Sequence, residues 1–84
     1  SFDDMQARIA KTIAFLDAVP RDTVDGCEDK EVVLGTPRGD FRFTGRSYVL
    51  TFALPNFYFH VTTAYALLRQ AGVQIGKLDY LRME

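Results

Sequence analysis

The sequence of 84 residues contains a single cysteine, Cys27, and almost no net charge. One cysteine cannot form an internal disulfide, which excludes a disulfide-stapled secreted mini-protein. Ten Lys and Arg residues stand against eleven Asp and Glu residues, for a formal charge of −1. Nucleic acids and anionic membranes are bound through an excess of positive charge. We therefore expect neither nucleic acid nor membrane as a partner.

A targeting segment and a membrane-spanning segment are also not expected. The N-terminus reads Ser-Phe-Asp-Asp, without the basic and apolar regions of a signal peptide. The most apolar stretch, residues 48–68, contains Pro55, His60 and two threonines, and polar groups at mid-segment are costly in lipid. The sequence predicts that this stretch is a helix buried in protein and that the location is cytoplasmic.

Hydrophobic residues are what the chain has in abundance. They make up 48% of it, with 13% aromatic residues, which excludes a disordered chain. A chain this short buries only about 60% of its unfolded surface, so its own core supplies little stability. The sequence predicts a single domain over residues 1–84 that needs partner chains.

Residues 3–19 have the pattern of an amphipathic helix. Its apolar residues recur three or four apart and include Phe2, Met5, Ile9, Ile13 and Leu16. Ser1 or Asp3 can cap the start of this helix. Pro20 ends it, because the residue before a proline is driven out of the helical region.

A β-hairpin is predicted over residues 31–44. Short apolar runs at 31–34 and 40–43 flank a five-residue loop that contains two glycines. Because strand side chains alternate between faces, four apolar residues share one face. They are Val32, Leu34, Phe41 and Phe43. A lone hairpin is marginal in water, so this face is expected to lie on a helix.

A long helix is predicted over residues 45–71, with a kink or a break near Pro55, because proline removes a backbone donor and clashes with the preceding turn. The tail, residues 73–84, is predicted to form a C-terminal arm. The long helix is apolar on nearly every side, which predicts that other helices cover it. Its predicted interface residues are Val49, Phe52, Phe57, Phe59, Val61 and Leu68.

These elements predict a mainly α fold, in which two long antiparallel helices with an inserted β-hairpin form half of an up-down four-helix bundle. Two helices cannot close such a core alone. A second copy, paired as a homodimer, or an N-terminal half absent from this sequence must complete it.

The segment FALPNFYFHVTTAYALLR, residues 52–69, resembles the C-terminal half of a bacterial family of uncharacterised proteins in the DinB-like superfamily. The resemblance extends to residues 6–13, to the hairpin end Phe43-Thr44-Gly45 and to the motifs at residues 72–81. It implies the four-helix bundle of that superfamily, with the first two helices missing here.

The resemblance also implies a metal site that is incomplete in this chain. DinB-like proteins often bind a divalent metal such as zinc or nickel through three histidines, and enzymatic members use it to activate water or a thiol. Only His60 matches a ligand position, and one turn away stand Asn56 and Ala64. One reading is therefore a degenerate metal-dependent hydrolase or thiol-transferase with His60 as the remaining ligand.

The residues themselves favour a non-catalytic binding or scaffold domain, with no catalytic residue and no cofactor expected. Asn56, His60 and Thr63 share one helix face and predict a polar stripe, which either lines a pocket or bonds to a neighbouring helix. Tyr58 and Tyr65 lie on another face, where tyrosines suit a helix–helix seam or recognition of a carboxylate.

Overall fold

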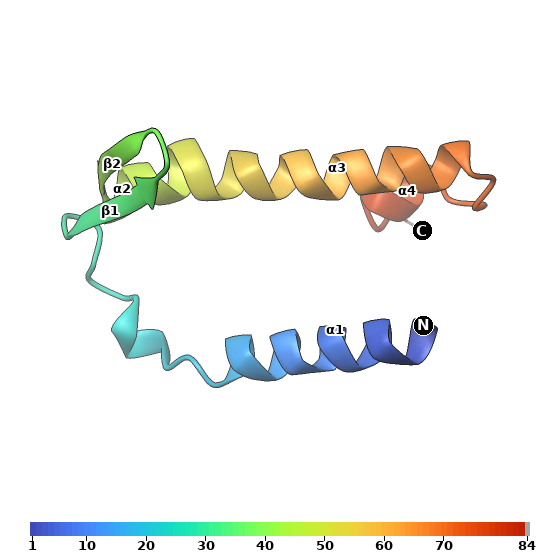
Figure 1. Cartoon of the computed structure of the whole chain (residues 1–84), viewed down its shortest axis with the longest axis horizontal. Helices are drawn as coiled ribbons and strands as arrows, with labels where there is room; N and C mark the ends of the chain where they lie inside the picture. The colour runs from blue at the N-terminus through green and yellow to red at the C-terminus, as the bar shows by residue number, and fades with distance from the viewer. Residues whose placement is uncertain (84) are drawn as a thin grey trace. The chain divides into compact units, whose positions relative to one another are not determined.

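The computed structural model describes residues 1–83 and is mainly helical, with one two-stranded antiparallel sheet (Figure 1). The chain divides into two units, Ser1–Arg46 and Ser47–Glu84. The first contains a long helix and the hairpin, and the second contains the longest helical segment and a short C-terminal helix. Within residues 1–83, no helix combines the length and hydrophobicity that a membrane span requires.

Helix α1 (Phe2–Asp17) starts at the predicted cap. The N–H of Asp4 donates to the Ser1 hydroxyl at 3.2 Å, which satisfies one of the free donors of the first turn. The predicted end at residue 19 is two residues too late. Val19 precedes Pro20 and its N–H reaches only the carbonyl three residues back, so the last turn tightens and the helix stops.

The polar segment after α1 contains one turn of 3₁₀ helix, η1 (Arg21–Thr23). Beyond it, the loop returns to lie against the start of α2 (Gly45–Ser47). The N–H of Arg46 donates to the carbonyl of Glu28 at 2.8 Å. A Cβ at Gly45 would lie 2.0 Å from the carbonyl oxygen of Cys27, so only glycine permits this backbone crossing.

Strands β1 (Glu31–Thr36) and β2 (Gly39–Thr44) form the predicted hairpin. The register places the four apolar residues in cross-strand pairs, Val32 with Phe43 and Leu34 with Phe41. Three of them are half-buried, whereas Phe41 is 52% exposed. The pairing agrees with the predicted shared face, and the covering of this face by a helix stays a prediction.

The hairpin connection is shorter than predicted, with two residues instead of five. Pro37 and Arg38 form the turn, and the paired strands extend to Thr36 and Gly39. The Thr36 hydroxyl donates to the carbonyl of Gly39 at 2.7 Å, and Gly39 has a φ of +119°, which a side chain would oppose. The hydrogen bond of the Thr36 hydroxyl thus accompanies a strand pairing that extends further toward the turn than predicted.

The long helical segment has an irregular stretch before Pro55 that differs from the predicted kink or break. After α2, a π-helix, η2 (Tyr48–Ala53), leads directly into α3 (Leu54–Gln70), with helical dihedral angles at both junctions. The N–H of Leu54 donates to the carbonyl five residues back, that of Val49. This wider register ends just before Pro55, which lies in the first turn of α3.

Helix α3 ends one residue before the predicted limit, and Gly72 follows with a φ of +99°, the left-handed conformation of a C-terminal cap. The predicted arm over residues 73–84 contains a short helix, α4 (Lys77–Tyr80), which the sequence pattern did not reveal. In Figure 1, α4 lies beside the C-terminal part of α3. The last residue of the predicted arm, Glu84, lies outside the described residues.

Candidate functional site

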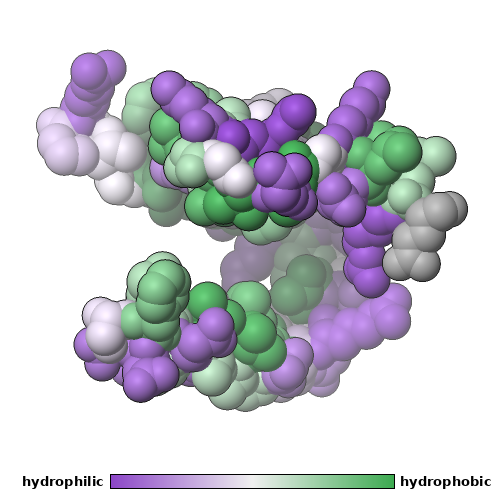
Figure 2. All heavy atoms as spheres, turned by 90° about the vertical axis from the view of Figure 1, so that its right-hand side faces the viewer, coloured by the Kyte–Doolittle hydropathy of each residue, from purple (hydrophilic) through white to green (hydrophobic). Residues whose placement is uncertain are grey.

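Apolar side chains are exposed on both units, and no residue in the range 1–83 is buried (Figure 2). On α1 the exposed fraction of the large apolar side chains runs from 50% at Ile9 to 83% at Phe2. Soluble monomers rarely leave contiguous apolar patches of this kind in water, and such patches mark interaction surfaces. The candidate site is therefore a surface and not an enclosed cleft.

Helix α1 presents one main apolar stripe, as the sequence predicts, and Phe15, which is 72% exposed, lies outside it. We call this stripe the α1 seam, and it consists of Phe2, Met5, Ile9, Ile13 and Leu16. The first turn of the helix is acidic, with Asp3 and Asp4, and its last turn has no basic residue. One apolar stripe on a helix with polar residues opposite it is the pattern of a helix with one neighbouring surface.

Helix α3 presents a second stripe, which we call the α3 seam. Its members recur at alternating intervals of three and four residues and are Leu54, Phe57, Val61, Ala64 and Leu68. This interval keeps residues on one helix face and is the repeat of helix–helix seams. Sequence reasoning missed Leu54 and Ala64, although the alternating interval contains the signal for both.

The predicted interface residues do not all lie together. Phe57, Val61 and Leu68 belong to the α3 seam, whereas Phe59 lies on another face of α3 and is 65% exposed. The other two, Val49 and Phe52, lie in η2, where the Phe52 ring is 5.5 Å from that of Tyr48. The predicted interface therefore spreads over more than one face of the helical segment.

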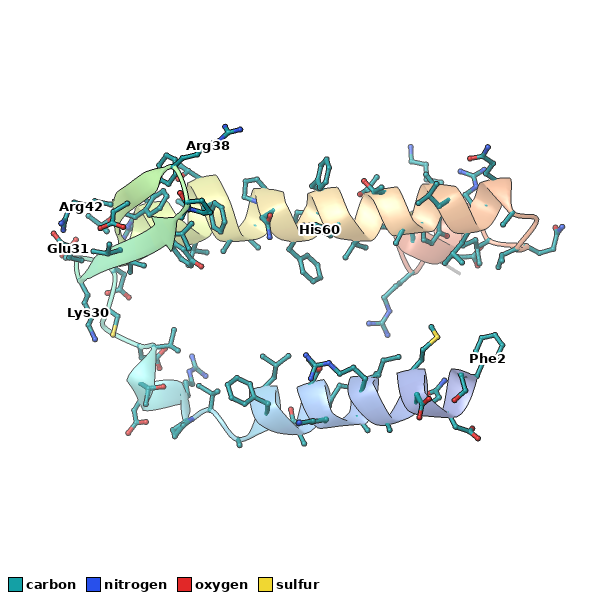
Figure 3. The ribbon with its side chains drawn as sticks, in the orientation of Figure 1. Phe2, Lys30, Glu31, Arg38, Arg42 and His60 are labelled. Carbon is teal, nitrogen blue, oxygen red and sulfur yellow. The ribbon has the colours of Figure 1, made fainter. Side chains whose placement is uncertain are left out.

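The polar stripe consists of Asn56, His60 and Thr63, which share one face of α3 and are all exposed. Figure 3 shows His60 near the middle of α3. Its ring meets that of Phe59 edge-on, with 5.3 Å between centroids. Among residues 1–83, no three His, Cys, Asp or Glu side chains lie close enough to hold a metal ion together.

Another face of α3 contacts α4. The Tyr65 hydroxyl donates to the carbonyl of Gly76, and the rings of Tyr65 and Tyr80 meet edge-on at 5.2 Å. The hydroxyls of Thr62 and Tyr80 are 3.5 Å apart. Tyr58 remains 53% exposed. Of the two predicted tyrosines, Tyr65 therefore joins two helices of one unit, and this contact was not apparent from the sequence.

These features define a mainly helical domain with an inserted hairpin and two exposed apolar seams. Residues 1–81 match the family described as Domain of unknown function (DUF1993), and the chain belongs to this family. No curated protein and no solved structure matches the chain. The expectation of an uncharacterised family is thereby confirmed.

Proposed function

We propose that this chain is a non-catalytic binding or scaffold domain, in which a second copy completes a DinB-like four-helix bundle. The observation that carries the proposal is the pair of exposed seams on α1 and α3 in a chain without a buried residue in the range 1–83. A bundle buries stripes of this kind between helices.

Helix length supports the need for a partner. Helix α1 has 16 residues and α3 has 17, little more than the length of about 12–15 residues below which isolated helices are marginal in water even when they are rich in alanine. Most helical stability in proteins comes from packing an amphipathic face against a neighbour. A second copy related by a two-fold axis supplies two further helices, which raises the number of long helices to that of a bundle. An N-terminal half outside this sequence is the other source of such helices.

In this proposal, the polar stripe of Asn56, His60 and Thr63 lines the interior of the completed bundle. An Asn–His–Thr face in such a position forms a small polar region among apolar side chains, a common arrangement for ligand recognition. No cofactor is required for this role. We also propose a cytoplasmic location and a bacterial origin, in keeping with the resemblance of residues 52–69 and with a chain whose one thiol is Cys27.

Sedimentation of the isolated chain at micromolar concentration tests the proposal. We expect a folded dimer, and a stable folded monomer would overturn it. Val61→Asp places a charge in the α3 seam and should abolish the dimer. Ala66→Asp, on another face of the same helix, is the matched control and should leave it intact. Far-UV circular dichroism of each variant shows whether the helices survive.

Metal analysis of the purified chain tests the catalytic alternative. Stoichiometric zinc or nickel that is lost on His60→Ala would favour a degenerate hydrolase or thiol-transferase and contradict the non-catalytic proposal. Metal at trace level, unchanged by this substitution, is the expected result. One histidine provides a single ligand, whereas protein zinc sites use three or four.

A further inference from the structure

We infer that Pro55 sets the side-chain register of the α3 seam. It holds η2 in the π form, so that Val49, and not Leu50, continues the seam toward the N-terminus. The inference rests on the proposed function, in which a second copy covers the α3 seam, and adds which residue of η2 shares that cover. Three observations carry it: the seam interval, the hydrogen bond at the end of η2 and the position of the proline.

The seam interval by itself points to Leu50. The seam residues from Leu54 to Leu68 recur at alternating intervals of three and four, and a further interval of four leads back from Leu54 to Leu50. Residue 49 is a valine, so apolar character does not distinguish the two positions. In an uninterrupted α-helix, Leu50 would continue the seam and Val49 would lie about 100° away from it around the helix axis.

The hydrogen bond at the end of η2 selects Val49 instead. The N–H of Leu54 donates to the carbonyl of Val49, five residues back, whereas an α-helix would use the carbonyl of Leu50. Residues joined by a helical hydrogen bond lie one turn apart on the same side of the helix. Val49 therefore lies one turn before Leu54 in line with the seam, and Leu50 is turned away from it.

Pro55 accounts for the π register at this place. In an α register the carbonyl of Thr51 would point at the proline, which has no N–H and whose ring clashes with a carbonyl four residues back. A local π turn is one way in which a helix accommodates a proline. The Thr51 hydroxyl acts in the same direction, because it donates to the carbonyl of Ser47 at 2.6 Å, a bond that disturbs the α-helical ladder.

Thiol labelling of single-cysteine chains tests the inference. In a Cys27→Ser background, Val49→Cys and Leu50→Cys chains react with a maleimide in buffer and in urea. Both positions are exposed in the single chain, so slow labelling in buffer reports cover by another helix. We expect Val49→Cys to react at least about tenfold more slowly in buffer than in urea, and Leu50→Cys to react at nearly equal rates.

Two exposed alanines of α3 provide the matched controls. Ala64→Cys lies in the α3 seam and should be protected like Val49→Cys, whereas Ala66→Cys lies on another face and should label freely. Far-UV circular dichroism of each chain shows whether the helices are retained.

Pro55→Ala separates the register from general stability. Without the proline the segment can return to α bonding, and protection should move from residue 49 to residue 50. Deleting Thr51 from the Pro55→Ala chain places Val49 four positions before Leu54 and should return the protection to Val49. Loss of protection at both positions in both chains would overturn the inference, because a helix that is only destabilised does not regain protection on the deletion.

NMR couplings across hydrogen bonds report the register directly. The N–H of Leu54 should couple to the carbonyl carbon of Val49 in the unaltered chain and to that of Leu50 in Pro55→Ala. Pro20→Ala, outside this helical segment, is the control for loss of a proline and should leave the coupling at Val49. A coupling that stays at Val49 in Pro55→Ala would overturn the role of Pro55.

The labelling results also separate the inference from the proposed function. Protection at Ala64→Cys and Leu50→Cys, without protection at Val49→Cys, would overturn the inference and leave the proposed function standing. Labelling of Ala64→Cys at its rate in urea would show that the α3 seam is not covered, and would remove the proposed function together with the inference.

Discussion

The loop and hairpin of the first unit are joined through backbone atoms, whereas α3 and α4 of the second unit are joined through aromatic side chains. In the first unit, the hairpin ladder and the crossing at Gly45 are contacts between main-chain atoms. In the second, Tyr65 and Tyr80 hold α4 against α3. A backbone contact tolerates many side-chain changes but fails where a side chain enters the contact itself. A side-chain contact, by contrast, is lost when the group that makes it is removed by substitution.

The two long helices differ in a related way. Helix α1 has one apolar seam, so one neighbouring surface satisfies it. Helix α3 has the α3 seam, the polar stripe and the tyrosine face that α4 occupies, and Phe59 lies outside all three. A helix with apolar residues on most sides needs several neighbours. Helices of nearly equal length therefore differ in the number of neighbouring surfaces that their side chains require.

The largest effect is expected from Gly45→Ala. The new Cβ would lie 2.0 Å from the Cys27 oxygen and 3.0 Å from its carbon, both backbone atoms that cannot rotate away. Separating the two segments should lower the free energy of unfolding by about 3 kcal/mol, as severe overpacking does. Urea unfolding at one fixed protomer concentration measures it. Gly35→Ala, where the nearest atom is 3.6 Å away, is the control, and equal midpoints for the two variants would contradict the prediction.

Phe43→Ala should have the next largest effect and tests whether the hairpin depends on side chains as well. The Phe43 ring is half-buried, so its removal should cost about 1.5 kcal/mol, roughly half the value for a fully buried ring. Phe41→Ala, on the same face but 52% exposed, should cost less. Urea midpoints of both variants provide the comparison. A larger loss for Phe41 would show that the covering surface lies nearer the turn.

Tyr65→Phe tests the side-chain contact of the second unit. It removes the hydroxyl that donates to the Gly76 carbonyl and keeps the ring that meets Tyr80. The loss should be about 1 kcal/mol, the usual net value of one hydrogen bond. Amide hydrogen exchange in α4 should rise more than in β1 and β2. Tyr58→Phe, at an exposed position, should change neither quantity, and a matching effect there would point to a general influence of the hydroxyl.

The smallest effect is expected from Arg42→Ala. Figure 3 labels Arg42 and Glu31 on the two strands, and their ion pair measures 2.9 Å with both side chains about two-thirds exposed. Exposed pairs of this kind contribute about 0.5 kcal/mol or less, because water and salt screen them. The unfolding midpoint should therefore barely move and should lose its weak salt dependence. A loss above that of Tyr65→Phe would show that the hairpin relies on its side chains.

Local elements were predictable where a few neighbouring residues decide them. Ser1 and the spacing of the α1 seam predicted α1, and Gly72 predicted the end of α3. The errors occurred where particular side-chain hydrogen bonds, one local at Thr36 and one long-range at Tyr65, decide the structure. The Thr36 hydroxyl shortened the hairpin turn, and the Tyr65 hydroxyl holds an arm whose residues show no clear period.

The residues of the candidate site also divide into those that the sequence predicted and those that it missed. Phe57, Val61 and Leu68 were predicted as interface residues because apolar side chains on all sides of a helix require cover, an argument from composition alone. The sequence analysis placed Phe59 with these three residues because it considered only apolar content. The alternating interval of three and four residues, which Leu54 and Ala64 complete, excludes Phe59 from the α3 seam. The polar stripe was identified from helical spacing, which requires only that the segment be a helix.

The sequence by itself determined the two long helices and the hairpin and predicted the need for a partner, because caps, periodicity and total apolar content act over a few residues or over the whole composition. Only the tertiary structure decided that η2 absorbs the irregularity before Pro55, that α4 occupies the tyrosine face, and that Gly45 lies against the carbonyl of Cys27. These three features depend on which backbone and side-chain groups meet in space. Such contacts join residues separated along the chain or shift a hydrogen-bond register, and no local pattern encodes either.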